Sequence, residues 1–446
     1  MAKAIMKRKL SIIFNLLLFP SFWTGLVRRR SLYQLNFTSG TTTCRECLMV
    51  ISSLLKLETI QHGKWISAFE KKVADLLGVR YAFTFSAGRV ALYAILKALD
   101  IGDGNEVILP GYTCVVVPAA IIYSGAKPVY VDISAEDYNI DVTKMEAKIT
   151  DRTRAIIAQH TYGNPSNVGA IRQICNRYNL VLIEDCAHTL GTFYKGSMLG
   201  TMGDVAFFST DHTKFISTSV GGIATTNDEL IGQRLQKVYD DTPFLSKRDI
   251  LKILFQFIAV SVLYYPRLYF LGKHLATLYA VLGLTFFMSN YSEIKKPESY
   301  PYPARMSNIQ AKIGISQINN LQKNIEHRTA IYLKYKEIFK GFKLKNTSDA
   351  PLRFVLEVSN RDEWIESLSP VLEVESWFDS CAQGKKDNLE EIEYKNGECP
   401  VAEGITNRVI NFPTHLKVRP RDVDSIARNL NERLLSGITN EVKKYD

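Results

Sequence analysis

The first 45 residues of the chain contain no aspartate or glutamate. They contain eight lysines and arginines, so they carry +8 of the formal net charge of +10, and the rest of the chain is nearly neutral. A protein that follows nucleic-acid phosphates spreads Lys and Arg over its folded surface, so this distribution argues against nucleic-acid binding and indicates a basic arm. The 446 residues are 46% apolar and 22% charged, globular proportions that exclude a largely disordered protein.

The chain also lacks a clear membrane-spanning segment. The uncharged run at residues 10–27 is interrupted by Asn15, Pro20 and Gly25, which makes it marginal for a spanning helix. No small-residue cleavage site follows it, which argues against a secretory signal, and basic clusters on both sides disfavour a spanning orientation. We expect residues 1–47 to form a basic and apolar arm that attaches a cytoplasmic protein peripherally to an anionic inner leaflet. A disordered or protein-packed arm is the alternative.

Cysteine and histidine are scarce, with seven of each. An odd number of scattered cysteines does not form a disulfide framework, which favours a reducing compartment. Cys44 and Cys47 form a single C-x-x-C without a second pair, and no histidine stands at zinc-site spacing beside them. The sequence therefore predicts no metal site.

Helical and strand patterns alternate from about Glu58. Residues 65–78 and 89–99 read as helices, the first ending at Gly78, and short β-rich runs follow within 102–111, 126–133, 154–160 and 180–187. This alternation predicts an α/β fold with a mainly parallel sheet in a large domain, residues 48–334, which binds its ligand at the carboxyl ends of the strands. Residues 307–334 read as one long helix, and residues 335–446 as a smaller C-terminal α+β domain.

An apolar insert interrupts the large domain at residues 249–290. It contains two uncharged runs, 253–265 and 275–288, each too short to cross a bilayer. One interpretation is a buried helical hairpin or a contact between subunits. The other is a second membrane-facing surface that acts together with the basic arm.

Lys214 and Asp185 are the main candidates for chemistry. Lys214 lies among serine, threonine and histidine residues and is followed by Gly221-Gly222, a setting whose hydroxyl and backbone donors suit a phosphate. A buried lysine there forms a Schiff base readily. Asp185 ends a very apolar strand, where an acid needs a cationic partner. In a pyridoxal phosphate (PLP) enzyme this partner is the pyridinium nitrogen, although an Asp that caps the next helix explains one carboxylate equally well.

A third candidate is the turn Ser86-Ala87-Gly88-Arg89, whose backbone N–H groups suit an anion at a helix start. From this turn onward the chain contains a series of motifs in a fixed order: SAGRVAL, GDGNEVILPGYT, GAKPVYVDI, AQHTYGNP, IEDCAHTLG, FFSTDHTK, GGIATTND, PARMSNIQAKIGISQI and CPVAEGITNRVINFPTH. Over residues 58–445, apart from the insert, this order resembles the DegT/StrS-type sugar-nucleotide aminotransferases, which are PLP enzymes of fold type I.

The resemblance implies PLP-dependent transamination in a homodimer whose active sites use both chains. It implies that Lys214 forms a Schiff base with PLP and moves a proton, and that Asp185 pairs with the pyridine nitrogen. It places Ser209 and the 86–89 turn at the phosphate and His188 near the ring hydroxyl. With Cys114 at the position of the usual stacking aromatic, stacking on the ring is either lost or taken over by Tyr112 or His188. The predicted cofactor-binding residues are Ser86, Ala87, Gly88, Arg89, Tyr112, Asp185, His188, Ser209 and Lys214.

The chain departs from the family pattern at several positions. Arg89 replaces a threonine of the phosphate turn, Cys114 the stacking aromatic, and Pro303 an asparagine that reaches the partner subunit. Residues 219–222 are Ser-Val-Gly-Gly, where the family has Gly-Glu-Gly-Gly. These changes leave a membrane-associated scaffold or regulatory protein without catalysis as one alternative.

The resemblance implies that an amino acid, glutamate in the first instance, donates its amino group to a nucleotide-linked keto-sugar in amino-sugar or surface-glycan biosynthesis. A PLP-dependent sugar dehydratase is a second alternative. Dehydratases of this family have a histidine in place of the lysine, so Lys214 argues against that branch.

Overall fold

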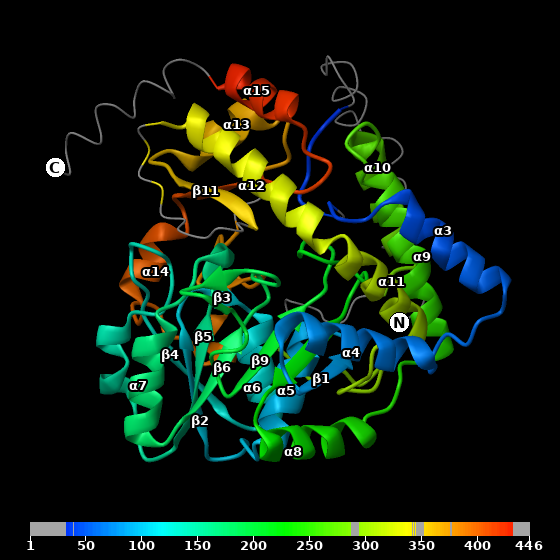
Figure 1. Cartoon of the computed structure of the whole chain (residues 1–446). Helices are drawn as coiled ribbons and strands as arrows, with labels where there is room; N and C mark the ends of the chain where they lie inside the picture. Colours follow the sequence, from blue (N-terminus) through cyan, green and yellow to red (C-terminus); the bar gives the residue numbers. More distant parts are fainter. Residues whose placement is uncertain are drawn as a thin grey trace, which may run out of the picture.

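The computed structural model describes residues 33–38, 40–286, 294–340, 342, 344, 352–374 and 377–430. Figure 1 shows a large α/β unit with a smaller unit above it, and a helical hairpin along one side of both. The expected α/β fold, with a mainly parallel sheet and a smaller α+β unit, is confirmed.

A seven-stranded sheet with the order β1-β10-β9-β6-β5-β2-β4 forms the centre of the large unit. Its strands are β1 (Tyr81–Phe85), β2 (Glu106–Pro110), β4 (Lys127–Val131), β5 (Thr153–Gln159), β6 (Val181–Asp185), β9 (Val205–Ser209) and β10 (Gly222–Thr226). Neighbouring strands from β9 to β4 are parallel, whereas β10 runs antiparallel to both β9 and β1. The carboxyl ends of β5, β6 and β9 therefore meet at one edge.

Both faces of this sheet are buried, as a parallel sheet requires. Successive residues of β5 point to opposite faces of the sheet. Ile157 packs against the core that contains α5 (Gly88–Ala98), and Ile156 packs against the core that contains α7 (Val168–Tyr178). Four further helices cover the large unit: α4 (Lys64–Leu77), α6 (Val116–Ser124), α8 (Glu229–Asp240) and α11 (Asn308–Asn319). The predicted end of the first helix is confirmed, since Gly78 adopts a left-handed φ of 69° after α4.

The single helix predicted over 307–334 is wrong. The structure has two helices there, α11 and α12 (Leu321–Ile338), separated at Asn320. Asn320 has a ψ of 4° and its side-chain amide donates to the carbonyl of Ser316, so it ends the first helix by occupying one of its last acceptors.

The smaller unit has a core of its own. The antiparallel strands β11 (Arg353–Glu357) and β13 (Val409–Pro413) pack with α12, α13 (Arg361–Leu368) and α15 (Pro420–Asn429). Leu35 and Phe37 are buried in this core, so residues 33–37 of the predicted arm belong to the folded body. Two short strands, β3 (Thr113–Cys114) and β12 (Ala382–Gln383), pair between the two units, and α14 (Pro400–Ile405) lies against the large one.

The apolar insert forms the hairpin of α9 (Lys247–Leu263) and α10 (Tyr269–Val281), beside α3 (Cys44–Leu55). One face of α9 is buried through Ile253, Leu254 and Phe257. Among the described helices, none combines the length and the apolar character needed to cross a bilayer. All seven cysteines lie in the described ranges and are free.

Candidate active site

A cavity of about 310 Å³ lies at the carboxyl ends of β5, β6 and β9, where the sheet topology predicts a ligand. It brings together seven of the predicted site residues: Ala87, Gly88, Arg89, Asp185, His188, Ser209 and Lys214. Ser86 and Tyr112 are buried but do not line it. Residues of the smaller unit and of the insert complete the wall.

Lys214 lies in the buried loop that returns from β9 to β10. Its backbone N–H donates to the carbonyl of Asp211 at 3.1 Å, and its Nζ lies 4.5 Å from the centre of the Trp377 ring. Burial lowers the pKa of Lys214 to about 8, and the nearby Asp211 carboxylate opposes this shift. Near pH 7 about a tenth of the amine is therefore neutral and nucleophilic, far more than for an exposed lysine, which favours covalent catalysis.

Asp185 is the last residue of β6 and is buried in the opposite part of the wall. Its carboxylate accepts a hydrogen bond from the backbone N–H of Ala187 at 3.0 Å, and burial raises its pKa, while Lys214 partly opposes the shift. Within the described part of the chain, no cation lies within salt-bridge distance of it. A buried carboxylate without a cation is the environment that a protonated pyridine nitrogen fits.

The start of α5 and the residues just before β10 line one part of the cavity together. A Cβ on Gly222 would lie 2.2 Å from the carbonyl oxygen of Ala87, and a Cβ on Gly88 would lie 3.1 Å from Cβ of Ser209. Glycine is thus required at 222 for the close approach of β10 to the turn. The cradle so formed presents backbone N–H groups and the Ser209 side chain to an anion.

Two residues that line the cavity, Arg89 and Thr213, each have a buried side-chain atom, Nε and Oγ1, without a hydrogen-bond partner among the described residues. Buried polar groups are normally paired, so unpaired donors beside a cavity indicate a polar ligand. Together with Lys214 and Asp185 they fit PLP, which has a phosphate at one end, an aldehyde, and a basic ring nitrogen. Arg89 fits as an additional cation at the phosphate.

His188 and two aromatic residues form the remaining wall. Its Nδ1 accepts from the backbone N–H of Tyr162 at 3.2 Å, and its ring lies 5.0 Å from Trp377. Burial lowers the pKa of His188 well below its usual value, with Lys214 adding to the effect, so the ring is neutral. Phe378 lies next to Trp377 and 4.9 Å from the ring of Tyr112, so Tyr112 supports the wall from behind.

The residues that line the cavity without having been predicted from the sequence include Trp377, Phe378, Gln256 and Phe286. The first two belong to the smaller unit, and the last two belong to or follow the hairpin insert, where Gln256 Oε1 accepts from the backbone N–H of Phe286 at 3.0 Å. No local pattern marks these positions, because they reach the cavity only through long-range folding. Cys114, which stands where the family has a stacking aromatic, also lines the cavity.

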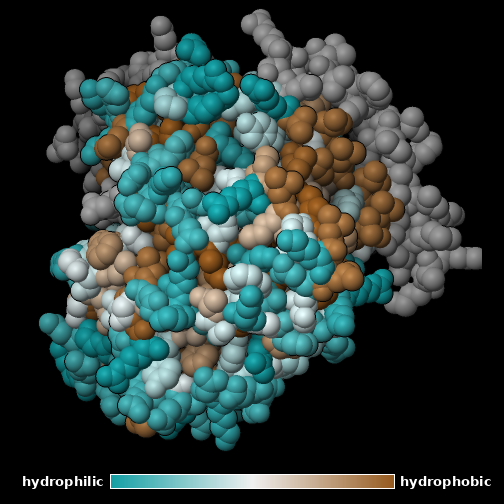
Figure 2. All heavy atoms as spheres, turned by 45° about the vertical axis from the view of Figure 1, so that its right-hand side comes forward, coloured by the Kyte–Doolittle hydropathy of each residue, from teal (hydrophilic) through white to brown (hydrophobic). Residues whose placement is uncertain are grey.

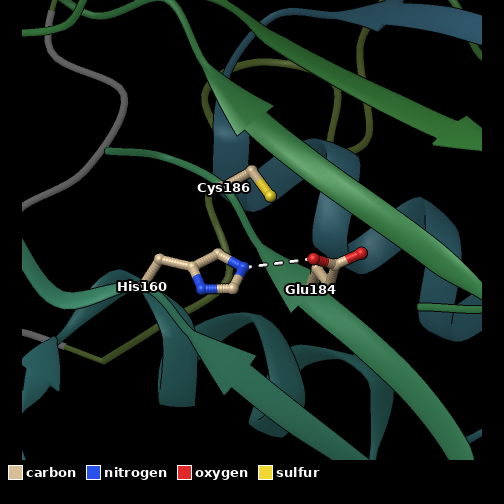
Figure 3. Close-up of side chains that lie close together, drawn as sticks. All are labelled: His160, Glu184 and Cys186. Carbon is tan, nitrogen blue, oxygen red and sulfur yellow. Dashed lines mark hydrogen bonds and ion pairs between the residues drawn. The ribbon is translucent and has the colours of Figure 1, made fainter. Parts of the chain in front are cut away.

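A second buried cluster, His160, Glu184 and Cys186, lies behind Asp185 and has the composition of a metal site (Figure 3). His160 Nδ1 accepts from the backbone N–H of Ser166 at 3.0 Å, so Nε2 carries the proton and donates to Glu184 at 3.2 Å. Both ring nitrogens are occupied, and burial raises the pKa of the Cys186 thiol, which leaves no thiolate. The cluster is therefore saturated by hydrogen bonds and does not offer a metal its ligands.

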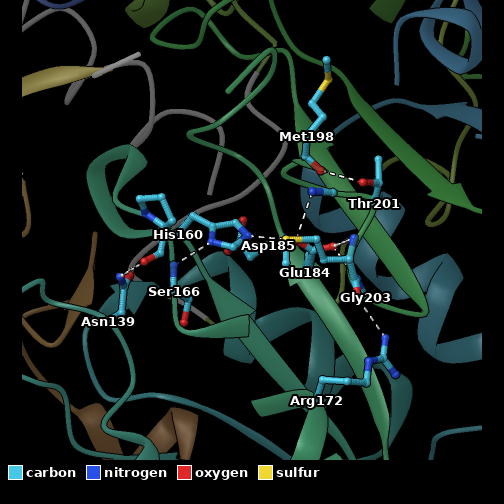
Figure 4. Close-up of polar contacts among 12 residues, drawn as sticks. Asn139, His160, Ser166, Arg172, Glu184, Asp185, Met198, Thr201 and Gly203 are labelled. Carbon is cyan, nitrogen blue, oxygen red and sulfur yellow. Dashed lines mark hydrogen bonds and ion pairs between the residues drawn. The ribbon is translucent and has the colours of Figure 1, made fainter. Parts of the chain in front are cut away.

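Figure 4 shows what this cluster does instead. Glu184 also accepts from the backbone N–H groups of Gly200, Met202 and Gly203, and Arg172 donates to the carbonyl of Met202. Burial alone raises the pKa of Glu184, but the bonds from His160 and the backbone outweigh it and lower the pKa. An ionised Glu184 thus fixes the 198–203 turn to β6, immediately before Asp185.

Comparison with known proteins agrees with this site. The model of the DegT/DnrJ/EryC1/StrS aminotransferase family matches residues 44–242 and 277–431. The chain is 42% identical over 172 residues to a GDP-perosamine synthase of Escherichia coli O157:H7, covering 39% of this chain and 47% of that protein. It is 31% identical over 398 residues to an uncharacterised protein of Methanocaldococcus jannaschii, covering 83% of this chain and 90% of that one. The chain thus spans about half the length of some curated relatives and most of another.

Solved structures show the same fold. Helicobacter pylori PseC, an aminotransferase of pseudaminic acid biosynthesis, superposes with a TM-score of 0.69 at 20% identity, over 90% of this chain and 100% of that one. The sugar aminotransferase Spr1654 of Streptococcus pneumoniae in its PLP form superposes with a TM-score of 0.69 at 20% identity, over 92% and 100%. The family model covers well over half of the chain and reaches both units. The chain therefore belongs to the DegT/DnrJ/EryC1/StrS aminotransferase family.

Proposed function

We propose that the protein is a PLP-dependent aminotransferase that moves an amino group from an amino acid, with glutamate as the first candidate, to a nucleotide-linked keto-sugar in amino-sugar or surface-glycan biosynthesis. One observation carries the proposal: a single cavity holds a buried lysine with a lowered pKa and a buried carboxylate without a cation. Beside them lie polar atoms without partners.

The side chains have distinct roles in this reaction. PLP, when bound, supplies an electron sink for the carbanion formed at the donor carbon. Lys214 would hold the cofactor covalently through Nζ, and its free amine would take up and return the proton of the donor Cα. Asp185 keeps the ring nitrogen protonated, and Gly88, Arg89 and Ser209 hold the phosphate. Neutral His188 presents a ring N–H without adding a charge that would compete with Lys214.

The acceptor class follows from the names of relatives. They include a GDP-perosamine synthase, a dTDP-3-amino-3,6-dideoxy-alpha-D-galactopyranose transaminase and a UDP-sugar 3-aminotransferase, so three different nucleotides occur among them. What they share is an amino sugar on a nucleotide. Lys214 disfavours a dehydratase, and the intact cavity disfavours a scaffold without catalysis.

The proposal includes a homodimer and peripheral attachment to an anionic inner leaflet. Family resemblance supports the dimer. The eight unopposed positive charges among residues 1–45 support the attachment, since each Lys or Arg near an anionic surface contributes about 1 kcal/mol. Most of that arm, residues 1–32, lies outside the described part of the chain.

Visible absorption of the purified protein tests the catalytic part. Wild type should show the band of lysine-bound PLP, and glutamate should bleach it. Lys214→Ala should lack the band. Lys417→Ala is the matched control, because burial also lowers the pKa of Lys417 to about 8 but that lysine does not line the cavity. A band that persists in Lys214→Ala, or that glutamate leaves unchanged in wild type, would contradict the proposal.

A further inference from the structure

An exposed apolar surface covers the side of the molecule formed by α3, α9 and α10. Figure 2 shows it as a brown area on the side that carries these helices. Its exposed side chains are Leu48, Ile51, Leu55, Leu57, Phe255, Val262, Tyr265, Leu268, Leu271, Leu275, Leu282 and Leu284. A monomeric soluble protein rarely exposes so many neighbouring large apolar side chains, so the surface indicates an interaction site. We call it the hairpin face.

The exposed positions recur at helical spacing on each helix. On α3 they are Leu48, Ile51 and Leu55, and on α10 they are Leu271 and Leu275. Cys47 and Val50 are buried on the opposite side of α3. Each helix thus has an inner apolar stripe that packs into the protein and an outer apolar stripe that does not, a pattern that folding alone does not require.

The basic arm leaves the folded body at this face. The backbone N–H of Gln34 donates to the carbonyl of Pro266 at 2.9 Å, and the side chain of Asn36 donates to the carbonyl of Tyr264 at 3.0 Å. Both acceptors lie in the turn between α9 and α10. The described part of the chain thus begins at the hairpin face, and the uncharged run at 10–27 and its flanking basic clusters precede this point in the sequence.

The helices that form the hairpin face carry mostly positive charge. Residues 44–56 and 247–281 contain seven cations and only two acids: Arg45, Lys56, Lys247, Arg248, Lys252, Arg267 and Lys273 against Glu46 and Asp249. Glu46 is buried and bonded to Thr43 and Ser316, so it does not offset the exposed cations. The face is apolar in the middle with basic residues on the same elements, and the arm that leaves from it is also basic.

We propose that the hairpin face is a membrane-docking surface, on which α3, α9 and α10 lie against an anionic leaflet together with the basic arm. This rests on the peripheral attachment in the proposed function and names the surface that makes the contact. Charge complementarity selects this occupant. A second copy of the chain, or residues 1–32 folded back onto the face, would bring basic groups together on both sides.

Docking in this way gives the catalytic cavity a fixed place relative to the leaflet. The same α9 that exposes Phe255 also directs the neighbouring Gln256 into the cavity wall. The hairpin therefore contributes to both surfaces, and docking brings the α9 part of the cavity wall close to the leaflet.

Co-flotation of the full chain with vesicles tests the proposal. The vesicles consist of phosphatidylcholine with phosphatidylglycerol, and the measurement is made at low and at high salt, where the electrostatic share of the arm is screened. We expect the triple variant Leu48→Gln, Phe255→Gln and Leu275→Gln, with one change on each helix, to weaken vesicle binding by at least about tenfold at high salt. Vesicles of phosphatidylcholine alone should bind the wild type less at low salt.

A matched triple variant provides the control. Leu230→Gln, Phe193→Gln and Leu333→Gln alter side chains that are 68%, 53% and 56% exposed, against 64%, 51% and 43% for the test positions, and none lies on the hairpin face. This control should bind vesicles like the wild type. Equal binding by both triple variants would overturn the proposal. So would a test variant that changes the oligomeric state in sedimentation without changing flotation, since the face would then contact a second copy. The PLP band of the test variant reports separately on the proposed function.

Discussion

Replacing Lys214, the predicted Schiff-base lysine, by an uncharged residue should stabilise the protein when PLP is absent. Lys214 has a pKa of about 8 in the folded protein, compared with 10.5 when exposed, because burial penalises its charged form. At pH 7 the folded protein must therefore hold a charge that the unfolded chain hydrates freely, at a cost of about 3 kcal/mol. Lys214→Met keeps the length of the side chain and removes the charge, so the cofactor-free variant should be more stable by that amount.

The sign of the pH dependence follows from the same shift. Between pH 8 and 10.5 the unfolded chain binds more protons at this position than the folded protein, so the wild type gains stability as the pH rises. The advantage of Lys214→Met should thus fall from about 3 kcal/mol at pH 7 to about 1 kcal/mol at pH 10. Urea unfolding of both cofactor-free proteins at the two pH values measures it. A difference that does not depend on pH, or a less stable variant, would refute the reasoning.

Three further predictions concern the walls of the site. Gly222→Ala should abolish the PLP band, because the new Cβ would lie 2.2 Å from the carbonyl oxygen of Ala87, whereas Gly404→Ala, with open space around it, should keep the band. Glu184→Gln should lower the free energy of unfolding by about 2 to 4 kcal/mol at pH 7, because its NH₂ group faces N–H donors. Because folding lowers the pKa of Glu184 from 4.5, its ionised carboxylate stabilises the folded protein fully above pH 4.5. Urea unfolding should therefore show that the stability difference between wild type and Glu184→Gln shrinks as the pH falls through the lowered pKa, and a difference that stays constant would contradict this. Phe286→Ala should raise KM for the nucleotide-linked acceptor while leaving the PLP band unchanged, because Phe286 lines the cavity but is not among the predicted cofactor-binding residues; an unchanged KM in steady-state kinetics would contradict this.

The parts of the site that the sequence predicts are those in which local pattern and chemistry coincide. Asp185 ends a buried strand and Lys214 follows another, so strand assignment alone places both at the same edge of a parallel sheet. Gly88 and Arg89 begin a helix, and the start of a helix is a local signal. In each case the backbone that positions the residue is formed by its own neighbours in the sequence.

The aromatic wall could not be predicted in this way. Trp377 and Phe378 are held at the cavity by tertiary contacts, including the bond from the Phe378 backbone N–H to the Tyr162 hydroxyl at 2.8 Å. Tyr112 was expected near the cofactor ring, but its side chain is buried in the core, where its hydroxyl hydrogen-bonds with that of Tyr162 at 2.8 Å, and Cys114 lines the cavity instead. Periodicity reports which side chains are buried, and it does not report which distant loop they meet.

The attachment of residues 33–37 also constrains the order in which the molecule is completed. These residues leave the ribosome before nearly all of the chain, yet the side chain of Gln34 bonds to the carbonyl of Ser369, 335 residues later, and Leu35 pairs with Leu372. Their partners in the hairpin turn are made only after more than half of the chain, and those in the smaller unit only after more than four fifths of it. Closing this segment onto the smaller unit is therefore a late, long-range step of folding.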